Sequence, residues 1–154
     1  MKKIPGIVIM CTLLLLGCQR NKVYEHYNKF ENYTWSRFDK VRFDIPIEQA
    51  GTEADIIFMV RHITQYPYDN LPVSIILLTP SGEERILEKE IKIKDEKGDF
   101  IGDGAGDLWD VQETLWPKFY FTEAGTYTIE FENIIPRPGI PGLMDIGIKV
   151  IKRK

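Results

Sequence analysis

Cysteine is nearly absent from this chain. The 154 residues contain two, Cys11 and Cys18, and both lie close to the N-terminus. From residue 19 onward the sequence therefore offers no thiol nucleophile, no disulfide and no thiolate metal ligand, so a domain there must be stabilised by its hydrophobic core. Histidine is equally scarce. His26 and His62 give no pair with metal-ligand spacing and no support for a Ser-His-Asp triad.

An excess of positive charge is also lacking. The formal net charge is −3, and it becomes about −5 when Lys2 and Lys3 are removed with residues 1–17. A basic surface for nucleic acid is therefore not indicated. Glycine alternates with other residues in 102–106, but the spacing differs from that of a phosphate-binding loop and no helix is predicted to follow. We expect neither nucleic acid nor nucleotide as a partner, and the sequence predicts no cofactor.

The N-terminus has the layout of a secretory signal. Lys2 and Lys3 precede a mainly apolar run over 4–16, which is shorter than the roughly 20 residues that cross a bilayer. The run ends in Leu15-Leu16-Gly17-Cys18, which resembles the bacterial lipobox, in which the cysteine is acylated and becomes the new N-terminus. We therefore predict a signal peptide over 1–17, lipid attachment at Cys18 and a firm membrane anchor through several acyl chains.

The remaining chain is expected to be all-β. Residues 18–36 are polar and aromatic, which predicts a lipid-anchored tether that docks near Trp35. Beyond it, helical periodicity is missing, and turn residues separate runs of β-branched and aromatic residues. We predict a single antiparallel β-sandwich over 37–154, with either immunoglobulin-like or jelly-roll-like connections. The expected strands are 41–47, 56–63, 73–78, 85–94, 115–121, 127–131 and 144–151, and the turn 79–82 predicts a hairpin between two of them.

The most unusual stretch is the glycine-rich segment 102–110. We favour a structural interpretation, in which the glycines bend the backbone while Leu108 and Trp109 pin the segment to the core. Calcium binding is a second interpretation, because carboxylates suit a hard cation, although their order does not match an EF-hand loop. The carboxylates in question are Asp99, Asp103, Asp107 and Asp110.

Two further interpretations concern recognition. Asp107 and Asp110 could act as acid and base on a glycoside with Trp109 as a sugar platform, although nothing in the sequence fixes their separation. The loops 66–70 and 136–142 carry tyrosine, proline and arginine, which suits contact with a protein partner. The candidate binding residues are accordingly Asp103, Asp107, Trp109, Asp110, Tyr66 and Tyr68.

Several short motifs occur in a fixed order along the chain. They are Tyr68-Asp69-Asn70-Leu71, Thr79-Pro80-Ser81-Gly82, the segment 102–110 that ends in Asp-Leu-Trp-Asp, Gly125-Thr126-Tyr127, and Pro141-Gly142-Leu143-Met144-Asp145-Ile146-Gly147. Together with the lipobox, this order resembles the GldH family of gliding-motility lipoproteins of Bacteroidetes.

The resemblance implies a non-enzymatic cell-envelope lipoprotein, associated with the gliding apparatus and its linked secretion machinery, that contacts other envelope proteins. It implies no catalytic residue, metal or cofactor. The residues after Cys18, Gln19-Arg20-Asn21-Lys22, lack the acidic cluster that often accompanies surface display in this phylum, so we expect a periplasm-facing position. The alternative from another class is a carbohydrate- or peptidoglycan-binding module that stacks sugars on Trp109, Trp116 and Tyr68.

Overall fold

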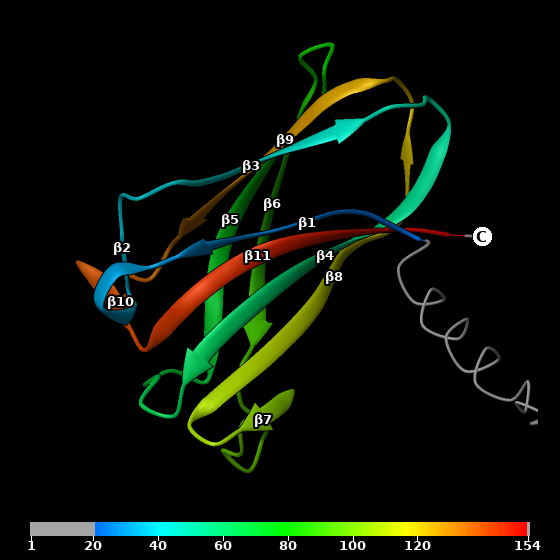
Figure 1. Ribbon diagram of the computed structural model, residues 1–154. Coiled ribbons are helices and arrows are strands. Elements are labelled where there is room, and N and C mark those ends of the chain that lie inside the picture. Colours follow the sequence, from blue (N-terminus) through cyan, green and yellow to red (C-terminus); the bar gives the residue numbers. More distant parts are fainter. Residues whose placement is uncertain (1–20, 154) are drawn as a thin grey trace, which may run out of the picture.

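The computed structural model describes residues 21–153 of the chain. The predicted signal peptide, residues 1–17, and the predicted lipid site, Cys18, lie outside the described residues. Within 21–153 the regular structure consists of eleven strands and one short 3-10 helix, which confirms the all-β prediction (Figure 1). No helix in this part of the chain has the length and apolar character needed to cross a membrane.

The strands form two large antiparallel sheets and one short ladder. The five-stranded sheet has the order β1-β11-β4-β8-β7, with bounds Lys22–Lys29, Leu143–Lys152, Thr52–Ile63, Leu108–Phe121 and Asp103–Ala105. The four-stranded sheet has the order β3-β9-β5-β6, with bounds Val41–Ile47, Gly125–Asn133, Asn70–Leu78 and Glu84–Lys92. The ladder pairs β10 (Gly139–Pro141) with β2 (Thr34–Ser36), and the helix η1 is Glu31–Tyr33.

The two large sheets pack face to face around one core. Along β3 buried and exposed residues alternate strictly, so that strand presents one apolar face to the core. Across the interface the rings of Phe58 from β4 and Phe131 from β9 stack with centroids 4.6 Å apart. Near one end of the core Phe121 meets Tyr127 edge-on at 4.8 Å. These aromatic contacts join the sheets into the predicted sandwich.

All seven predicted strands are present, and β4 and β8 extend furthest beyond their predicted starts. β4 begins four residues before the predicted start, and β8 begins seven residues before it. The predicted hairpin is confirmed, because β5 and β6 pair from Leu78 with Glu84 to Asn70 with Lys92. The strands that the pattern did not predict are β1, β2, β7 and β10.

The sandwich begins earlier than the predicted boundary at residue 37, whereas the burial of Trp35 agrees with the predicted docking of the preceding segment. Residues 22–29 form β1, which pairs with β11 along its length, and Trp35 is completely buried. The Trp35 indole N–H donates to the backbone oxygen of Asp39 at 2.8 Å, and its ring stacks on Phe30 at 5.2 Å. The segment looks polar because β1 is an edge strand in which no side chain is fully buried.

Candidate functional site

The glycine-rich stretch forms a β-hairpin at one end of the five-stranded sheet. β7 pairs with the start of β8, and Gly106, with φ of +63°, lies in the turn. Gly102 precedes β7 with φ of +95°, and a Cβ at that position would lie 2.2 Å from the backbone oxygen of Asp110. The backbone thus requires glycine at position 102 and favours it at position 106, as the structural interpretation predicts.

Trp109 packs the hairpin onto the sandwich. Its half-buried ring lies against Gly104, where a Cβ would come within 2.9 Å of the ring, and it tilts against Phe100 with centroids 5.5 Å apart. Phe100 in turn contacts the buried ring of His62 at 4.9 Å. Trp109 therefore holds the hairpin as predicted. Leu108 is 37% exposed, so the prediction that it also pins the segment is wrong.

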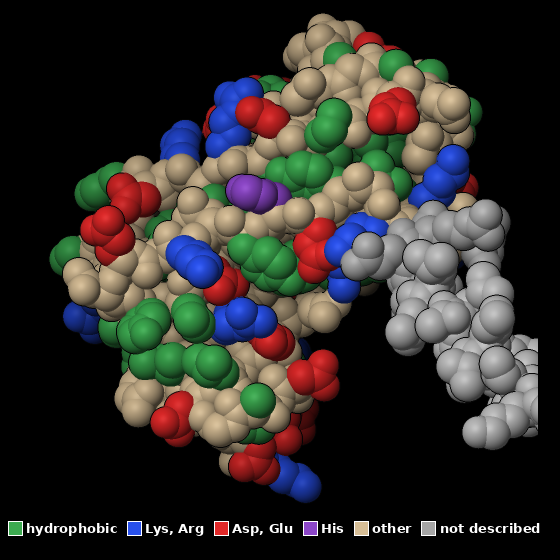
Figure 2. Space-filling model, viewed as in Figure 1, with side chains coloured by type: hydrophobic (Ala, Val, Ile, Leu, Met, Phe, Trp, Pro, Cys, Tyr) green, Lys and Arg blue, Asp and Glu red, His purple; other side chains and the backbone are tan. Residues whose placement is uncertain are grey.

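A row of five charged residues crosses the five-stranded sheet beside the hairpin. Strand register places them in adjacent positions on β1, β11, β4, β8 and β7, in the order Lys29, Asp145, Arg61, Asp110 and Asp103. Directly opposed residues point to the same face, so neighbours in the row share one surface. On the face shown in Figure 2, side chains of both signs are interleaved over the sheet.

Arg61 is at the centre of this charged row. Its Nε and Nη2 groups donate to the two carboxylate oxygens of Asp110 at 2.7 and 3.0 Å. A paired contact of this kind fixes the orientation of both side chains. Asp110 is therefore engaged as an ion-pair partner, and the structure does not present it as an unpaired carboxylate beside Asp107.

Asp145 is the buried member of the charged row. It is 2% exposed, and its Oδ2 lies 4.0 Å from Nη1 of Arg61. Burial raises the pKa of the Asp145 carboxyl, the positive charge of Arg61 lowers it, and the negative charge of Asp110 raises it again. Within the described residues Oδ1 of Asp145 has no hydrogen-bond partner. Arg61 thus balances the negative charge of two carboxylates, that of Asp110 at the surface and that of Asp145 in the interior.

The tyrosine loop between β4 and β5 lies at the same end of the molecule, but its two tyrosines differ in exposure. Tyr66 is buried, and its hydroxyl donates to the backbone oxygen of Asn70 at 3.1 Å. Burial raises the pKa of Tyr66 well above its ordinary value. Tyr68 is half-buried and meets Tyr66 edge-on at 5.7 Å. Tyr66 is therefore part of the core, and only Tyr68 offers contact surface.

The predicted acidic ligands do not gather into a metal site. Asp99, Asp103 and Asp107 are exposed, and Asp110 is bound to Arg61. In the part of the chain that the structure describes, no group of three or more histidine, cysteine or acidic side chains is arranged to hold a metal ion. The calcium interpretation therefore gains no support from the geometry.

The three rings of the predicted sugar platform are also separated. Trp116 lies seven residues along β8 from Trp109, which corresponds to roughly 23 Å of strand. There it packs edge-on against Phe119 with centroids 6.2 Å apart. Only Trp109 and Tyr68 lie at the end with the hairpin, and both are half-buried.

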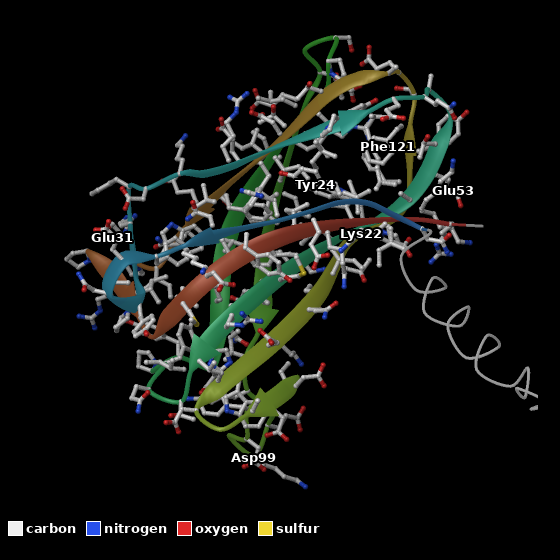
Figure 3. All side chains as sticks on the ribbon, in the orientation of Figure 1. Lys22, Tyr24, Glu31, Glu53, Asp99 and Phe121 are labelled. Carbon is white, nitrogen blue, oxygen red and sulfur yellow. The ribbon has the colours of Figure 1, made fainter. Side chains whose placement is uncertain are left out.

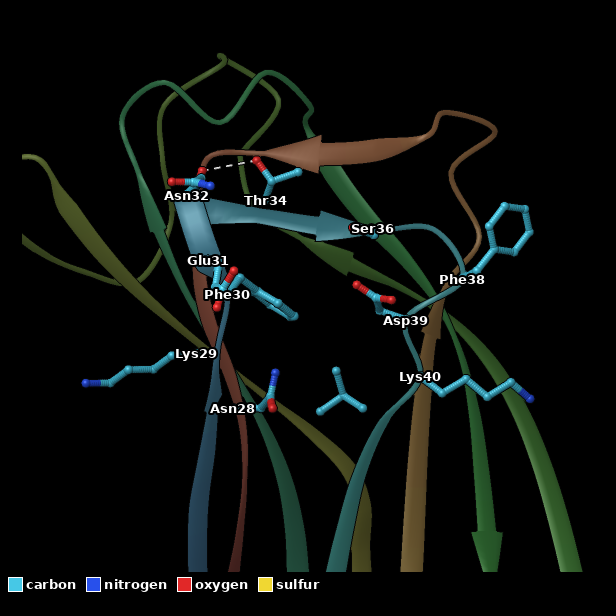
Figure 4. Close-up of a pocket in the computed structure, with 11 residues that line it drawn as sticks. Asn28, Lys29, Phe30, Glu31, Asn32, Thr34, Ser36, Phe38, Asp39 and Lys40 are labelled. Carbon is cyan, nitrogen blue, oxygen red and sulfur yellow. Dashed lines mark hydrogen bonds between the residues drawn. The ribbon is translucent and has the colours of Figure 1, made fainter.

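An open hollow of about 800 Å³, which the sequence did not predict, lies between the end of β1 and the start of β3. In Figure 4, Asp39 points toward this hollow, whereas Phe38 and Lys40 point away from it. The hydroxyl of Thr34 donates to the backbone oxygen of Asn32 at 3.1 Å and closes the turn above it. Backbone, amide and charged groups line this hollow, but they do not point toward one place where they could bind a particular ligand.

Arg61 and Asp145 also belong to the site, although no pattern in the sequence singled them out. Asp145 carries a signal in hindsight, because it is a single acid among the apolar residues 143–148 and a buried acid needs a cation nearby. Arg61 is such a cation, but only strand register brings the two together.

Comparison with known proteins assigns a family to this sandwich. The family model described as GldH lipoprotein matches residues 22–150. The gliding motility lipoprotein GldH of Flavobacterium johnsoniae is 24% identical over 159 residues, covering 96% of each chain. A gliding motility lipoprotein GldH homolog of Christiangramia forsetii is 23% identical over 155 residues, covering 95% of this chain and 93% of its own.

Similarity to solved structures is weak. TmCBM61 in complex with beta-1,4-galactotriose has a TM-score of 0.35 and 11% identity, and the match covers 84% of this chain and 68% of that one. At this score the likeness has no bearing on function.

Proposed function

This chain belongs to the GldH lipoprotein family, and we propose that it is a lipid-anchored, non-enzymatic accessory component of the gliding motility apparatus and its linked secretion machinery. The observation that carries the proposal is the extent of the family match, which begins at the first residue of β1 and reaches β11. The relative named for gliding motility also aligns over nearly its whole length. The similarity therefore extends over the whole sandwich, from β1 to β11.

Membrane attachment through Cys18 forms the first part of the proposal. It is supported by the lipobox-like Leu15-Leu16-Gly17-Cys18 and by the start of the folded domain only a few residues later, at Lys22. The absence of an acidic cluster in Gln19-Arg20-Asn21-Lys22 favours a periplasm-facing position.

Contact with other envelope proteins forms the second part. We assign it to the loop end, defined as residues 64–70, 95–102 and the hairpin 103–110. Trp109 is packed and Asp110 is bound by Arg61, so this end has a fixed shape before any partner arrives. A preformed surface loses little conformational entropy on binding. The exposed side chains of Asp99 and Asp107 give it an acidic rim that suits a basic partner surface, and the exposed Asp69 beside them pairs with Lys94 at 3.3 Å.

Site-specific photo-crosslinking in intact envelopes tests the partner assignment. A photoreactive residue at Asp69 or Asp107 should capture one or more envelope proteins, because both positions are exposed at the loop end. The matched control is Glu88, an exposed position on the four-stranded sheet, which should capture much less. Recovery of glycan without protein at the loop-end positions would overturn the assembly hypothesis in favour of the carbohydrate-binding module.

Two conservative substitutions test the proposal that the protein is not an enzyme. Asp107→Asn and Asp110→Asn keep the side-chain shape but remove any acid or base function. Gliding should persist in the Asp107→Asn strain. Asp110→Asn should affect only protein stability, because it removes a charge partner of Arg61. Loss of function by either variant, at normal protein level and with unchanged photo-crosslinking from Asp69 to envelope proteins, would contradict the non-enzymatic assignment.

A further inference from the structure

The chain enters the sandwich at one corner, and that corner is tied down. The backbone oxygen of Asn21 accepts a hydrogen bond from the backbone N–H of Lys152 at 2.7 Å. The start of β1, the end of β11 and the start of β4 lie together there, as Figure 1 shows. We call this the anchor end, and it comprises residues 21–23, 46–53, 118–121 and 151–153.

The distance from the predicted lipid site to this corner is short. Three peptide steps separate Cys18 from Asn21, and a fully extended chain covers at most about 11 Å over three steps. β8 runs from the loop end to the anchor end over 14 residues, a path of roughly 45 Å along the strand. In Figure 3, Lys22 and Glu53 lie at the anchor end and Asp99 at the opposite one. An acylated Cys18 would therefore hold the anchor end at the bilayer surface.

The anchor end also has a surface that suits lipid headgroups. A hollow of about 330 Å³ opens between the start of β1 and the end of β3, and apolar Val23, Pro46 and Ile47 line it together with Lys22 and Lys152. Glu48 is the acidic residue of the lining, and Glu25 is paired with Lys22. Long lysine stems can cover apolar surface while the ammonium group reaches phosphate.

An exposed tyrosine adds to this surface. Tyr120, the last residue but one of β8, is 58% exposed, and its hydroxyl lies close to Gly51, where a Cβ would be 3.3 Å away. Tyrosine is favoured at the membrane–water interface because its ring is apolar and its hydroxyl is polar. Lysine, tyrosine and apolar side chains thus share the end that the short connection holds near the membrane.

We infer that the anchor end rests on the phospholipid headgroups of the membrane that holds Cys18, with a headgroup phosphate in the hollow beside Lys152. The short connection raises the local concentration of headgroups, so weak individual contacts suffice. The sandwich then stands end-on, and the loop end is held away from the surface, at the other end of β8. This inference rests on the Cys18 anchor of the proposed function.

Fluorescence quenching on vesicles tests this orientation with the full acylated chain. With Cys18 acylated, a single introduced cysteine can be labelled at Ala50 on the anchor end, Thr114 on the five-stranded sheet, or Lys97 on the loop end. On vesicles of phosphatidylethanolamine and phosphatidylglycerol with a headgroup nitroxide, the label at residue 50 should be quenched several-fold more strongly than the other two. Strongest quenching at residue 114 would mean that the sheet lies flat, and equal quenching at all three would mean no docking. Either result overturns the inference.

Two variants separate the contributions of the tether and of the surface. A glycine-serine insertion of about 20 residues before Asn21 adds roughly 25 Å of reach, and it should bring quenching at residue 50 down to the level at residue 97. Lys152→Glu should weaken quenching at residue 50, whereas the matched control Lys92→Glu, on the exposed edge strand β6, should not. If either the insertion or Lys152→Glu leaves the quenching at residue 50 unchanged, the inference is refuted. If the acylated chain fails to float with the vesicles, the result contradicts the Cys18 anchor of the proposed function.

Discussion

Replacing Arg61 by methionine should destabilise the sandwich chiefly through Asp145. Methionine keeps an apolar stem of similar length but removes the positive charge that faces two carboxylates. Asp145 is 2% exposed and cannot regain water without local opening. The substitution therefore leaves a buried carboxylate without its nearest cation, which is among the more costly changes a core can suffer.

The size of this effect follows from distance and exposure. Two unit charges 4.0 Å apart attract by about 4 kcal/mol at an effective dielectric constant of 20 and by about 1 kcal/mol in water. Because the Arg61 side chain is 36% exposed, we expect about 1–3 kcal/mol for this pair. The more exposed pair with Asp110 adds roughly 0.5–1 kcal/mol. Arg61→Met should therefore lower the free energy of unfolding by about 2–4 kcal/mol.

A double-mutant cycle with Asp145→Asn isolates the buried pair. Asparagine keeps the shape of Asp145 and removes its charge, so Arg61→Met should cost only about 1 kcal/mol in that background. The assay is urea unfolding of the unacylated chain that begins at residue 19. A coupling free energy below about 0.5 kcal/mol would refute the assignment of Arg61 as the counter-charge of Asp145.

The pH dependence supplies a second readout of the same pair. The folded-state pKa of Asp145 is raised above the unfolded value, so the folded chain binds the proton more tightly. This contribution to stability is present at low pH and is lost as pH rises from about 4 through the raised pKa. Arg61→Met removes an attraction that lowers this pKa, so the decline should extend to higher pH. Asp145→Asn should abolish it.

The remaining predictions concern other parts of the molecule. Gly102→Ala should lower the free energy of unfolding in urea by more than about 2 kcal/mol, because the new Cβ would meet a backbone oxygen. The control is Gly82→Ala, where φ is +91° and the space around the residue is open. It should lower that free energy by only about 1 kcal/mol, the cost of the backbone conformation. Gly147→Ala should place a Cβ 2.7 Å from the ring of Tyr27 and 2.8 Å from the backbone of His26, so amide hydrogen exchange in β1 should become faster. Burial lowers the pKa of His62, so the stability of the wild-type chain should fall as pH drops below about 6.5, and His62→Gln should remove that loss in pH-dependent unfolding. Cys18→Ala should give protein that is made but absent from the membrane fraction in flotation; firm membrane association would contradict the anchor assignment.

The fold was predictable wherever burial follows a simple period. Alternation along 41–47 has a local cause, because one face of β3 is buried and the other is wet. The hairpin of β5 and β6 was predictable because Thr79-Pro80-Ser81-Gly82 supplies turn chemistry between two apolar runs.

The missed strands lack such a signal. β7 has three residues and includes a glycine, too short for any period to appear. The sequence of β1 resembles that of a tether because Glu25, His26 and Lys29 interrupt its aromatic residues. Edge strands tolerate this polarity, and only the partner β11 shows that residues 22–29 are paired.

The charged row could not have been predicted because it depends on strand register. Lys29, Arg61 and Asp145 come from three strands far apart in the sequence, and an irregularity between Leu143 and Asp145 sets which residue of β11 faces Arg61. A shift of one residue would turn Asp145 to the opposite face. The candidate site is thus a property of the assembled sheet, whereas the packing of Trp109 was foreseeable from the glycines before it.

The position of β1 links the proposed anchor to the charged row. β1 is the first element after Cys18, and it pairs with β11 from Lys22 to Lys29. Lys29, at the far end of this strand, belongs to the row that continues through Arg61 to Asp103 on the hairpin. If Cys18 carries the proposed lipid, a load applied at the loop end would reach it through paired strands, with the β1–β11 hydrogen bonds in shear. With the proposed lipid at one end and the proposed partner at the other, paired strands would keep the distance between membrane and partner fixed, which a flexible tether over residues 18–36 would not.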